Sequence, residues 1–225
     1  MLLTRFGRRE WGLATAIAIA IGVPLTLLGW WWTWIPIGIL WIAVAGFFRD
    51  PLGRMPATEN PLDLISPADG RISAVEQVDT HEATDGKPAV IVRIFLSVLD
   101  VHLNRAPCDA TIRWIRHTPG KYLDARSEES AKVNESNLLA LQTTDGRTIG
   151  VRQVSGAIAR RIVCPVGEGD ELRRAARFGM IKFGSTTELV VPHADGTEIH
   201  VGVGDRVTGG VTVLVTLPDT IPSND

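Results

Sequence analysis

Three side chains of this sequence have the types needed for nucleophilic catalysis: the hydroxyl of Ser185, the imidazole of His102 and the carboxylate of Asp69. A serine hydroxyl becomes reactive when a neighbouring base removes its proton, and histidine is the side chain whose ordinary pKa lies nearest neutral pH. A carboxylate beside the imidazole can hold the ring in the orientation that accepts that proton. The three residues are far apart in the sequence, so this chemistry requires a fold that brings them together.

Ser185 lies in the segment K-F-G-S-T-T-E at residues 182–188, which runs into the apolar residues 189–191. The apolar run predicts a buried β-strand. A glycine such as Gly184 weakens a strand, and it usually marks a bulge or a close approach of another backbone. A structural bulge is therefore one interpretation of the Gly-Ser pair, and a reactive backbone site is the other.

Four polar side chains, those of Asp100, His102, Asn104 and Arg105, lie within six residues directly after an apolar run. Such a group is either a hydrogen-bonded network at the end of a strand or a base with its supporting side chains. The context of Asp69 is less specific, because the Asp-Gly pair is common in ordinary turns.

The composition argues against several classes of function. The chain has 225 residues and a formal net charge of −2, so we expect no nucleic-acid partner. The two cysteines, Cys108 and Cys164, fit neither the spacing of a zinc site nor a disulfide framework. We therefore predict no metal site, and the sequence leaves the oligomeric state open.

Residues 11–48 carry no charged side chain and account for the positive mean hydropathy of the chain, +0.13. A single helix of this length would extend about 57 Å, whereas the hydrocarbon core of a bilayer is about 30 Å thick. We therefore predict a helical hairpin within residues 1–50, with arms at 11–29 and 34–48 and a turn rich in tryptophan, which prefers the membrane interface. A re-entrant hairpin and a cleaved signal peptide are the alternatives.

Arginines flank the apolar segment on both sides, and by the positive-inside rule both of its ends lie in the cytoplasm. We therefore expect an anchor in the cell membrane. Residues 51–61 contain proline, glycine and polar side chains and are predicted to form a linker. The domain that follows, residues 62–225, would then lie on the cytoplasmic side of the membrane.

This domain is predicted to consist mainly of β-strands. Runs rich in valine and isoleucine at residues 89–96, 148–154 and 211–217 are separated by Asp-Gly and Gly-Gly pairs, which are typical of turns between antiparallel strands. A weak internal repeat relates residues 166–175 to residues 201–210, since each contains Gly-x-Gly-Asp between apolar residues.

These repeated turns resemble those of biotinyl and lipoyl carrier domains. We therefore predict a single antiparallel β domain that is built from carrier-like barrel-sandwich units. The same likeness supplies a rival function, a membrane-tethered carrier or adaptor module with a modified lysine at Lys182. The residues around Lys182 match neither the biotin pattern nor the lipoyl pattern, which argues against this alternative.

Six segments of the chain follow one another in a fixed order: residues 66–70 (S-P-A-D-G), 95–107, 117–121 (H-T-P-G-K), 135–137 (E-S-N), 159–164 and 177–185, which ends in F-G-S. This ordered set resembles the phosphatidylserine decarboxylases, in particular their short subfamily with hydrophobic N-terminal segments. The resemblance covers nearly all of the chain after residue 60.

The resemblance implies a proenzyme that cleaves itself between Gly184 and Ser185. The products would be a β chain, residues 1–184, and an α chain, residues 185–225, which stay associated. Ser185 would become a covalent pyruvoyl cofactor, which serves as an electron sink in decarboxylation. A glycine suits the first position, because a missing Cβ leaves its carbonyl open to attack.

The same resemblance implies His102 as the base and Asp69 as its orienting partner. Thr186, Asn104 and His117 are predicted as supporting residues.

The implied reaction is the membrane-associated conversion of phosphatidylserine to phosphatidylethanolamine in phospholipid biosynthesis. The same reaction on another serine-headed lipid is an alternative, because the headgroup chemistry is common to both. The sequence departs from the longer family members at Arg105, where they have a second histidine. Arg105 would bind the lipid phosphate or the serine carboxylate, or would pair with Asp100.

Overall fold

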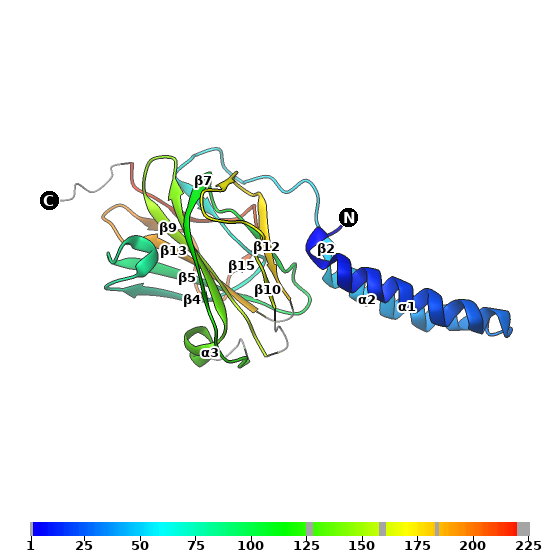
Figure 1. Cartoon of the computed structure of the whole chain (residues 1–225). Coiled ribbons are helices and arrows are strands. Elements are labelled where there is room, and N and C mark those ends of the chain that lie inside the picture. The colour runs from blue at the N-terminus through cyan, green and yellow to red at the C-terminus, as the bar shows by residue number, and fades with distance from the viewer. Residues whose placement is uncertain (1, 125–127, 158–160, 183–184, 220–225) are drawn as a thin grey trace. The chain divides into compact units, whose positions relative to one another are not determined.

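The computed structural model describes residues 2–124, 128–157, 161–182 and 185–219. Its contacts divide the chain into two compact units, Met1–Gly53 and Arg54–Asp225. The first unit is a helical hairpin, and the second consists mainly of β-strands (Figure 1).

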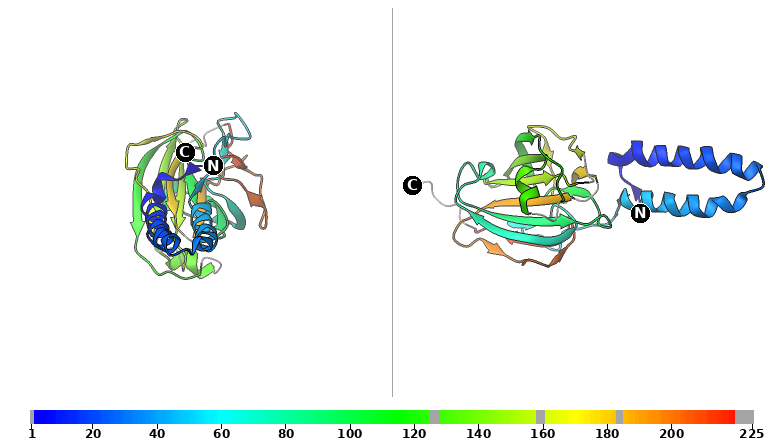
Figure 2. Two further views of the ribbon diagram at one scale, coloured as in Figure 1. Left: turned by 90° about the vertical axis from the view of Figure 1, so that its right-hand side faces the viewer. Right: turned by 90° about the horizontal axis from the view of Figure 1, so that it is seen from below.

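Two apolar helices, α1 (Arg8–Leu27) and α2 (Trp34–Phe47), form the first unit and lie side by side in opposite directions (Figure 2). Its short elements are η1 (Arg5–Gly7), η2 (Trp31–Thr33) and the paired strands β1 (Leu2–Leu3) and β2 (Arg49–Asp50). The predicted helical hairpin is confirmed. Helix α1 begins before the predicted residue 11, because the arginines and the glutamate that precede it are good helix formers.

Tryptophan side chains join the two helices. Trp34 Nε1 donates to Thr26 Oγ1 at 2.8 Å, and Trp41 Nε1 donates to Thr15 Oγ1 at 2.9 Å. The segment Arg5–Leu27 is long and apolar enough to cross a membrane by length and composition, whereas the second apolar helix is shorter. Most of the apolar side chains of α1 are exposed within the unit, which favours membrane association.

A curled eight-stranded antiparallel sheet dominates the second unit (Figure 1). In spatial order its strands are β11 (Glu171–Leu172), β7 (Ala110–Thr118), β8 (Ser136–Thr143), β9 (Thr148–Val154), β13 (Ser185–Pro192), β5 (Ala89–Leu96), β4 (Gly70–Val78) and β15 (Arg206–Val207). Strand β13 therefore lies inside the sheet, between β9 and β5.

Two three-stranded sheets complete the second unit. One contains β10 (Ile162–Val163), β12 (Arg177–Ile181) and β6 (Leu103–Arg105), and the other contains β14 (Glu198–Ile199), β16 (Val213–Thr216) and β3 (Asp63–Ile65). The main core packs Leu64, Phe178 and Leu214 of these small sheets against side chains of the large sheet. The remaining elements are η3 (Glu82–Thr84) and α3 (Glu128–Val133).

The two Gly-x-Gly-Asp segments that repeat in the sequence form the same kind of turn in the structure. Asp170 accepts a hydrogen bond from the N–H of Gly167 at 2.8 Å, and Asp205 accepts one from the N–H of Gly202 at 2.8 Å. Each of these turns leads into a two-residue strand at the edge of the large sheet. The predicted fold class, an antiparallel β domain that follows a helical hairpin, is confirmed.

Candidate active site

Ser185 is the first residue of β13 and is paired with Leu96, the last residue of β5. Alternate residues of a strand face opposite sides of the sheet. Leu189 and Val191 of β13 belong to the main core, so Ser185 lies on this inner side of the sheet. Its side chain is buried at the point where the chain enters the central strand.

Among the residues that the structure describes, the Ser185 hydroxyl has no hydrogen-bond partner. Burying a hydroxyl without a partner costs about 1–3 kcal/mol, and so such a group needs an explanation. A hydroxyl that is held for reaction rather than for structure would provide one. Gly184, the predicted partner in cleavage, lies outside the described residues.

His102 is fully buried just before β6. Its Nδ1 atom lies 3.0 Å from the carbonyl oxygen of Asp100, and a tautomer that donates this bond keeps Nε2 as the basic nitrogen. The carbonyl of His102 accepts a hydrogen bond from the N–H of Ile181 at 3.2 Å. Because Ile181 ends β12, the histidine is bound to the strand that leads to Ser185.

The Asp69 carboxylate is held by Arg54, one of the arginines that follow the apolar segment. Arg54 Nη1 and Nη2 donate to the two Asp69 oxygens at 2.5 and 2.6 Å, and Nη1 also donates to the carbonyl of Gly209 at 2.9 Å. The contacts described for Asp69 and His102 thus involve different partners. Orientation of His102 by Asp69 stays a prediction.

The strand register brings the Asp69 turn and the start of β13 to the same end of the large sheet. Gly70, next to Asp69, is so close to β5 that a Cβ atom there would lie 2.2 Å from the carbonyl oxygen of Phe95. Phe95 is paired in turn with Thr186, the residue after Ser185. The Asp69 turn therefore lies one strand away from the start of β13.

A chain of buried amide side chains runs along the inner side of the sheet beside Ser185. Asn104 Nδ2 donates to Thr187 Oγ1 at 2.9 Å, and Gln153 Nε2 donates to Asn104 Oδ1 at 2.8 Å. Asn137 Nδ2 completes the chain with a bond of 3.1 Å to Gln153 Oε1. Sequence reasoning named Asn104 as a supporting residue but missed Gln153 and Thr187, because only the strand register reveals their contacts.

The other predicted residues occupy different environments. Thr186 is buried and faces the outer side of the sheet, whereas the His117 Nε2 atom lies 2.9 Å from a carboxylate oxygen of Glu135 near the surface. Arg105 is buried, and its Nη1 donates to the carbonyl of Ala175 at 3.1 Å. Roles for Thr186, His117 and Arg105 in the reaction stay predictions.

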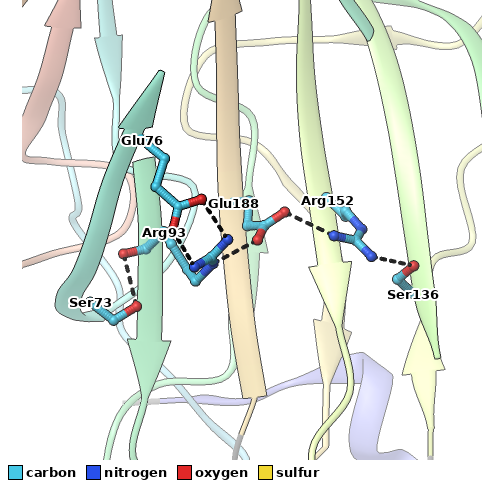
Figure 3. Close-up of polar contacts among 6 residues, drawn as sticks. All are labelled: Ser73, Glu76, Arg93, Ser136, Arg152 and Glu188. Carbon is cyan, nitrogen blue, oxygen red and sulfur yellow. Dashed lines mark hydrogen bonds and ion pairs between the residues drawn. The ribbon is translucent and has the colours of Figure 1, made fainter. Parts of the chain in front are cut away.

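The outer side of β13 carries a buried carboxylate between two arginines (Figure 3). Glu188 is 1% exposed, and its oxygens accept hydrogen bonds from Arg93 Nε at 2.8 Å and Arg152 Nη1 at 3.2 Å. Both arginines are directly opposite Glu188 in the register, one on β5 and one on β9. These ion pairs fix the register of β13, because a one-residue slip would move Glu188 to the inner side.

The described residues contain no group of three or more histidine, cysteine or acidic side chains that could hold a metal ion. Burial raises the pKa of the Cys108 thiol to about 12 and also raises the pKa of Cys164. Both thiols are therefore protonated near neutral pH and are poor nucleophiles. Within this part of the chain, Ser185 with His102 remains the arrangement best suited to nucleophilic chemistry.

A buried serine hydroxyl without a hydrogen-bond partner among the described residues, at the start of a central strand, is more typical of an enzyme than of a carrier module. Lys182, the residue of the carrier alternative, is only 7% exposed, whereas a swinging-arm lysine must reach solvent.

Residues 41–215 match the phosphatidylserine decarboxylase family. A phosphatidylserine decarboxylase proenzyme of Cereibacter sphaeroides is 42% identical over 195 residues, which cover 83% of this chain and 82% of the relative. The phosphatidylserine decarboxylase proenzyme of Ralstonia nicotianae is 38% identical over 81% of this chain. That of Burkholderia mallei is 35% identical over 82% of this chain. Each match covers 82% of the relative. The chain therefore belongs to the phosphatidylserine decarboxylase family.

Proposed function

We propose that the protein is a membrane-associated, pyruvoyl-dependent decarboxylase that converts phosphatidylserine to phosphatidylethanolamine after cleaving itself between Gly184 and Ser185. The observation that carries the proposal is the Ser185 hydroxyl, which is buried at the start of the central strand without a hydrogen-bond partner among the described residues. Membership of the decarboxylase family supplies the substrate class and the reaction.

Self-cleavage begins when Ser185 Oγ loses its proton to His102 and attacks the carbonyl carbon of Gly184. The peptide C–N bond breaks as the ester C–O bond forms, and the amino group of residue 185 takes up a proton. Elimination then removes the α proton of residue 185 and expels the Gly184 carboxylate, which ends the β chain. Water hydrolyses the remaining enamine, ammonia leaves, and residue 185 keeps a pyruvoyl group.

The surroundings of residue 185 suit such a group. The inner side of β13 next to it is uncharged, and its polar neighbours Asn104, Gln153 and Thr187 bind one another. When formed, the pyruvoyl group supplies the electron-accepting carbonyl on which decarboxylation of an amino-acid headgroup depends. We assign to His102 the proton that replaces the lost carboxylate, since its backbone is hydrogen-bonded to Ile181, at the end of the strand that leads to residue 185.

The two chains would remain together after cleavage. The α chain contains β13, which is hydrogen-bonded on both edges to strands of the β chain. Leu189, Val190 and Val191 are fully buried, and burial contributes about 25 cal/mol for each Å² of apolar surface. The Glu188 ion pairs, with Arg93 and Arg152 of the β chain, add a polar link.

Intact-mass measurement of the purified protein tests the proposal. We expect two chains that divide after Gly184, with the mass of the α chain showing a pyruvoyl group in place of Ser185. A single chain with a modified Lys182 would instead support the carrier. Release of carbon dioxide from phosphatidylserine, compared with an ether-linked serine lipid, would separate the two candidate substrates.

The hairpin would hold the second unit at the cytoplasmic face of the cell membrane, where the lipid is concentrated. Deletion of residues 1–50 should leave self-cleavage intact, because the proposed chemistry lies between Asp69 and Ser185. It should reduce activity on bilayers more than on a dispersed short-chain lipid, since a tether raises the effective concentration. Equal loss on both substrates with normal pyruvoyl content would show that the hairpin shapes the active site.

A further inference from the structure

Arg54, which has no role in the reaction steps described above, binds the carboxylate of Asp69. The two Arg54 nitrogens approach the two Asp69 oxygens at 2.5 and 2.6 Å, and the side chains are only 11% and 14% exposed. A two-point contact between a guanidinium and a carboxylate fixes the position and the plane of the carboxylate, which a single hydrogen bond does not. Most surface ion pairs lack both this geometry and this burial.

The Arg54 guanidinium also joins the Asp69 turn to a distant loop. Nη1 donates to the carbonyl of Gly209 at 2.9 Å. Gly209 packs directly on the turn, because a Cβ atom there would lie 2.9 Å from the carbonyl carbon of Ala68 and 3.1 Å from the nitrogen of Asp69. Arg54 therefore binds both sides of this contact and restricts the movement of the carboxylate.

A second copy of the turn forms without a guanidinium bound to its aspartate among the described residues. Residues 107–112 (P-C-D-A-T-I) repeat the pattern of residues 67–72 (P-A-D-G-R-I). In the second copy, the Asp109 carboxylate accepts a hydrogen bond from the backbone N–H of Arg174 at 2.8 Å. Among the described residues, no guanidinium is hydrogen-bonded to Asp109, yet the turn forms.

We propose that Arg54 is a positioning residue for self-cleavage, which holds the Asp69 carboxylate in the orientation that acts on His102. This inference rests on the proposed function, because it assigns Arg54 to the same reaction. A carboxylate has about four lone-pair sites, so two hydrogen bonds from Arg54 leave others open to the imidazolium that forms when His102 takes the Ser185 proton. Arg54 acts through Asp69 and does not touch the reacting atoms.

The test follows cleavage of full-length precursor made by cell-free synthesis, with Arg54→Ala and Arg54→Lys beside the native chain. Loss of a hydrogen-bonded charged partner should slow cleavage of Arg54→Ala by roughly ten- to a hundredfold. Lysine keeps the charge but cannot make the two-point contact, so the cleavage rate of Arg54→Lys should lie between those of the native chain and Arg54→Ala. Guanidinium ions at non-denaturing concentration should partly restore Arg54→Ala, because they can occupy the vacated position.

The matched control is Arg113→Ala, which breaks an exposed ion pair between Arg113 and Asp85. It should cleave at the native rate. Native-rate or faster cleavage of Arg54→Ala would overturn the inference, and faster cleavage would mean that Arg54 restrains Asp69. Slow cleavage that neither lysine nor guanidinium improves would also overturn it, because the arginine would then matter only for folding.

A further variant separates this inference from the proposed function. Asp69→Asn should cleave slowly and should gain nothing from guanidinium. If Asp69→Asn cleaves slowly while Arg54→Ala is normal, only the role of Arg54 is wrong. If Asp69→Asn cleaves at the native rate, the assignment of Asp69 fails together with that of Arg54.

Discussion

The turn around Asp69 and the turn around Asp109 belong to two copies of one structural unit. Each turn leads into a long strand, β4 or β7, that has an irregular register in its first half. Ile72 exchanges backbone hydrogen bonds with the Gly-x-Gly-Asp turn at residues 202–205, at 2.8 and 2.9 Å. Ile112 does the same with residues 167–170, at 2.8 and 3.0 Å.

The two copies are also linked to each other. The N–H of Ile65 donates to the carbonyl of Pro107 at 3.0 Å, and the N–H of Arg105 donates to the carbonyl of Pro67 at 2.9 Å. The two bonds join equivalent positions, so each copy contacts the other in the same way. Any difference in function between the two aspartate turns must therefore come from the residues that surround each turn.

Of the two aspartate turns, only the first lies near the start of β13. Gly70 packs against the backbone of Phe95, one strand away from Ser185, whereas the corresponding Ala110 is paired with Thr143 at the opposite end of the sheet. The turn is a scaffold in both copies, and we propose that its position beside β13 is what makes Asp69 available for chemistry.

The largest difference is expected for the two aspartates. Asp69→Ala should slow self-cleavage by about 10²- to 10⁴-fold, the range that a well-positioned general base contributes. Asp109→Ala should cleave at nearly the native rate, because its carboxylate binds only a backbone N–H among the described residues. The time course of precursor disappearance measures both, and similar rates for the two variants would refute the distinction between the copies.

The next largest difference concerns the small residue after each aspartate. In Gly70→Ala the new Cβ atom would collide with the Phe95 carbonyl, and the φ of +155° at Gly70 is rarely adopted by alanine. We expect a loss of about 2 kcal/mol or more in the free energy of unfolding. The reverse change, Ala110→Gly, should cost only about 0.5–1 kcal/mol.

Unfolding of both variants is best measured in the Ser185→Ala background, where every chain is uncleaved. Equal losses for Gly70→Ala and Ala110→Gly would show that the close approach to Phe95 relaxes easily.

A smaller loss of stability, equal in the two copies, is expected at the Gly-x-Gly-Asp turns, which are alike in both. Asp170 and Asp205 each accept a hydrogen bond of 2.8 Å from a glycine N–H in an exposed turn. Asp170→Ala and Asp205→Ala should each lower the free energy of unfolding by about 0.5–1.5 kcal/mol. Thermal unfolding of the uncleaved chain tests this, and a loss confined to one variant would mean that the two turns differ in ways their hydrogen bonds do not reveal.

The sequence predicted what depends on local pattern. The uncharged segment predicted the hairpin, and the Gly-x-Gly-Asp repeat predicted the paired turns, because both signals lie within one stretch of chain. The side-chain types of Ser185, His102 and Asp69 indicated a nucleophile, a base and an orienting carboxylate, and the family motifs implied which role each has. Arg54 was missed because its partner is a carboxylate fifteen residues away across two loops. Gln153 was missed because its contact with Asn104 depends on the register of strands that no local pattern specifies.

The smallest expected effect concerns Cys108, which occupies the position of Ala68 in the first copy. Burial, and secondarily the neighbouring Asp109, raise the pKa of this thiol to about 12, so at pH 8 only about one molecule in 10⁴ carries the reactive thiolate. Cys108→Ala should therefore leave self-cleavage unchanged and should lower stability by less than about 1.5 kcal/mol, since it places the residue of one copy into the other.

In the native chain, iodoacetamide should leave Cys108 unmodified until a denaturant is added, as peptide mass mapping would show. The Cys108→Ala chain, treated in parallel, identifies the signal that belongs to this cysteine. Rapid modification of Cys108 without denaturant would mean that the second turn opens readily, and that the two copies differ in stability as well as in chemistry.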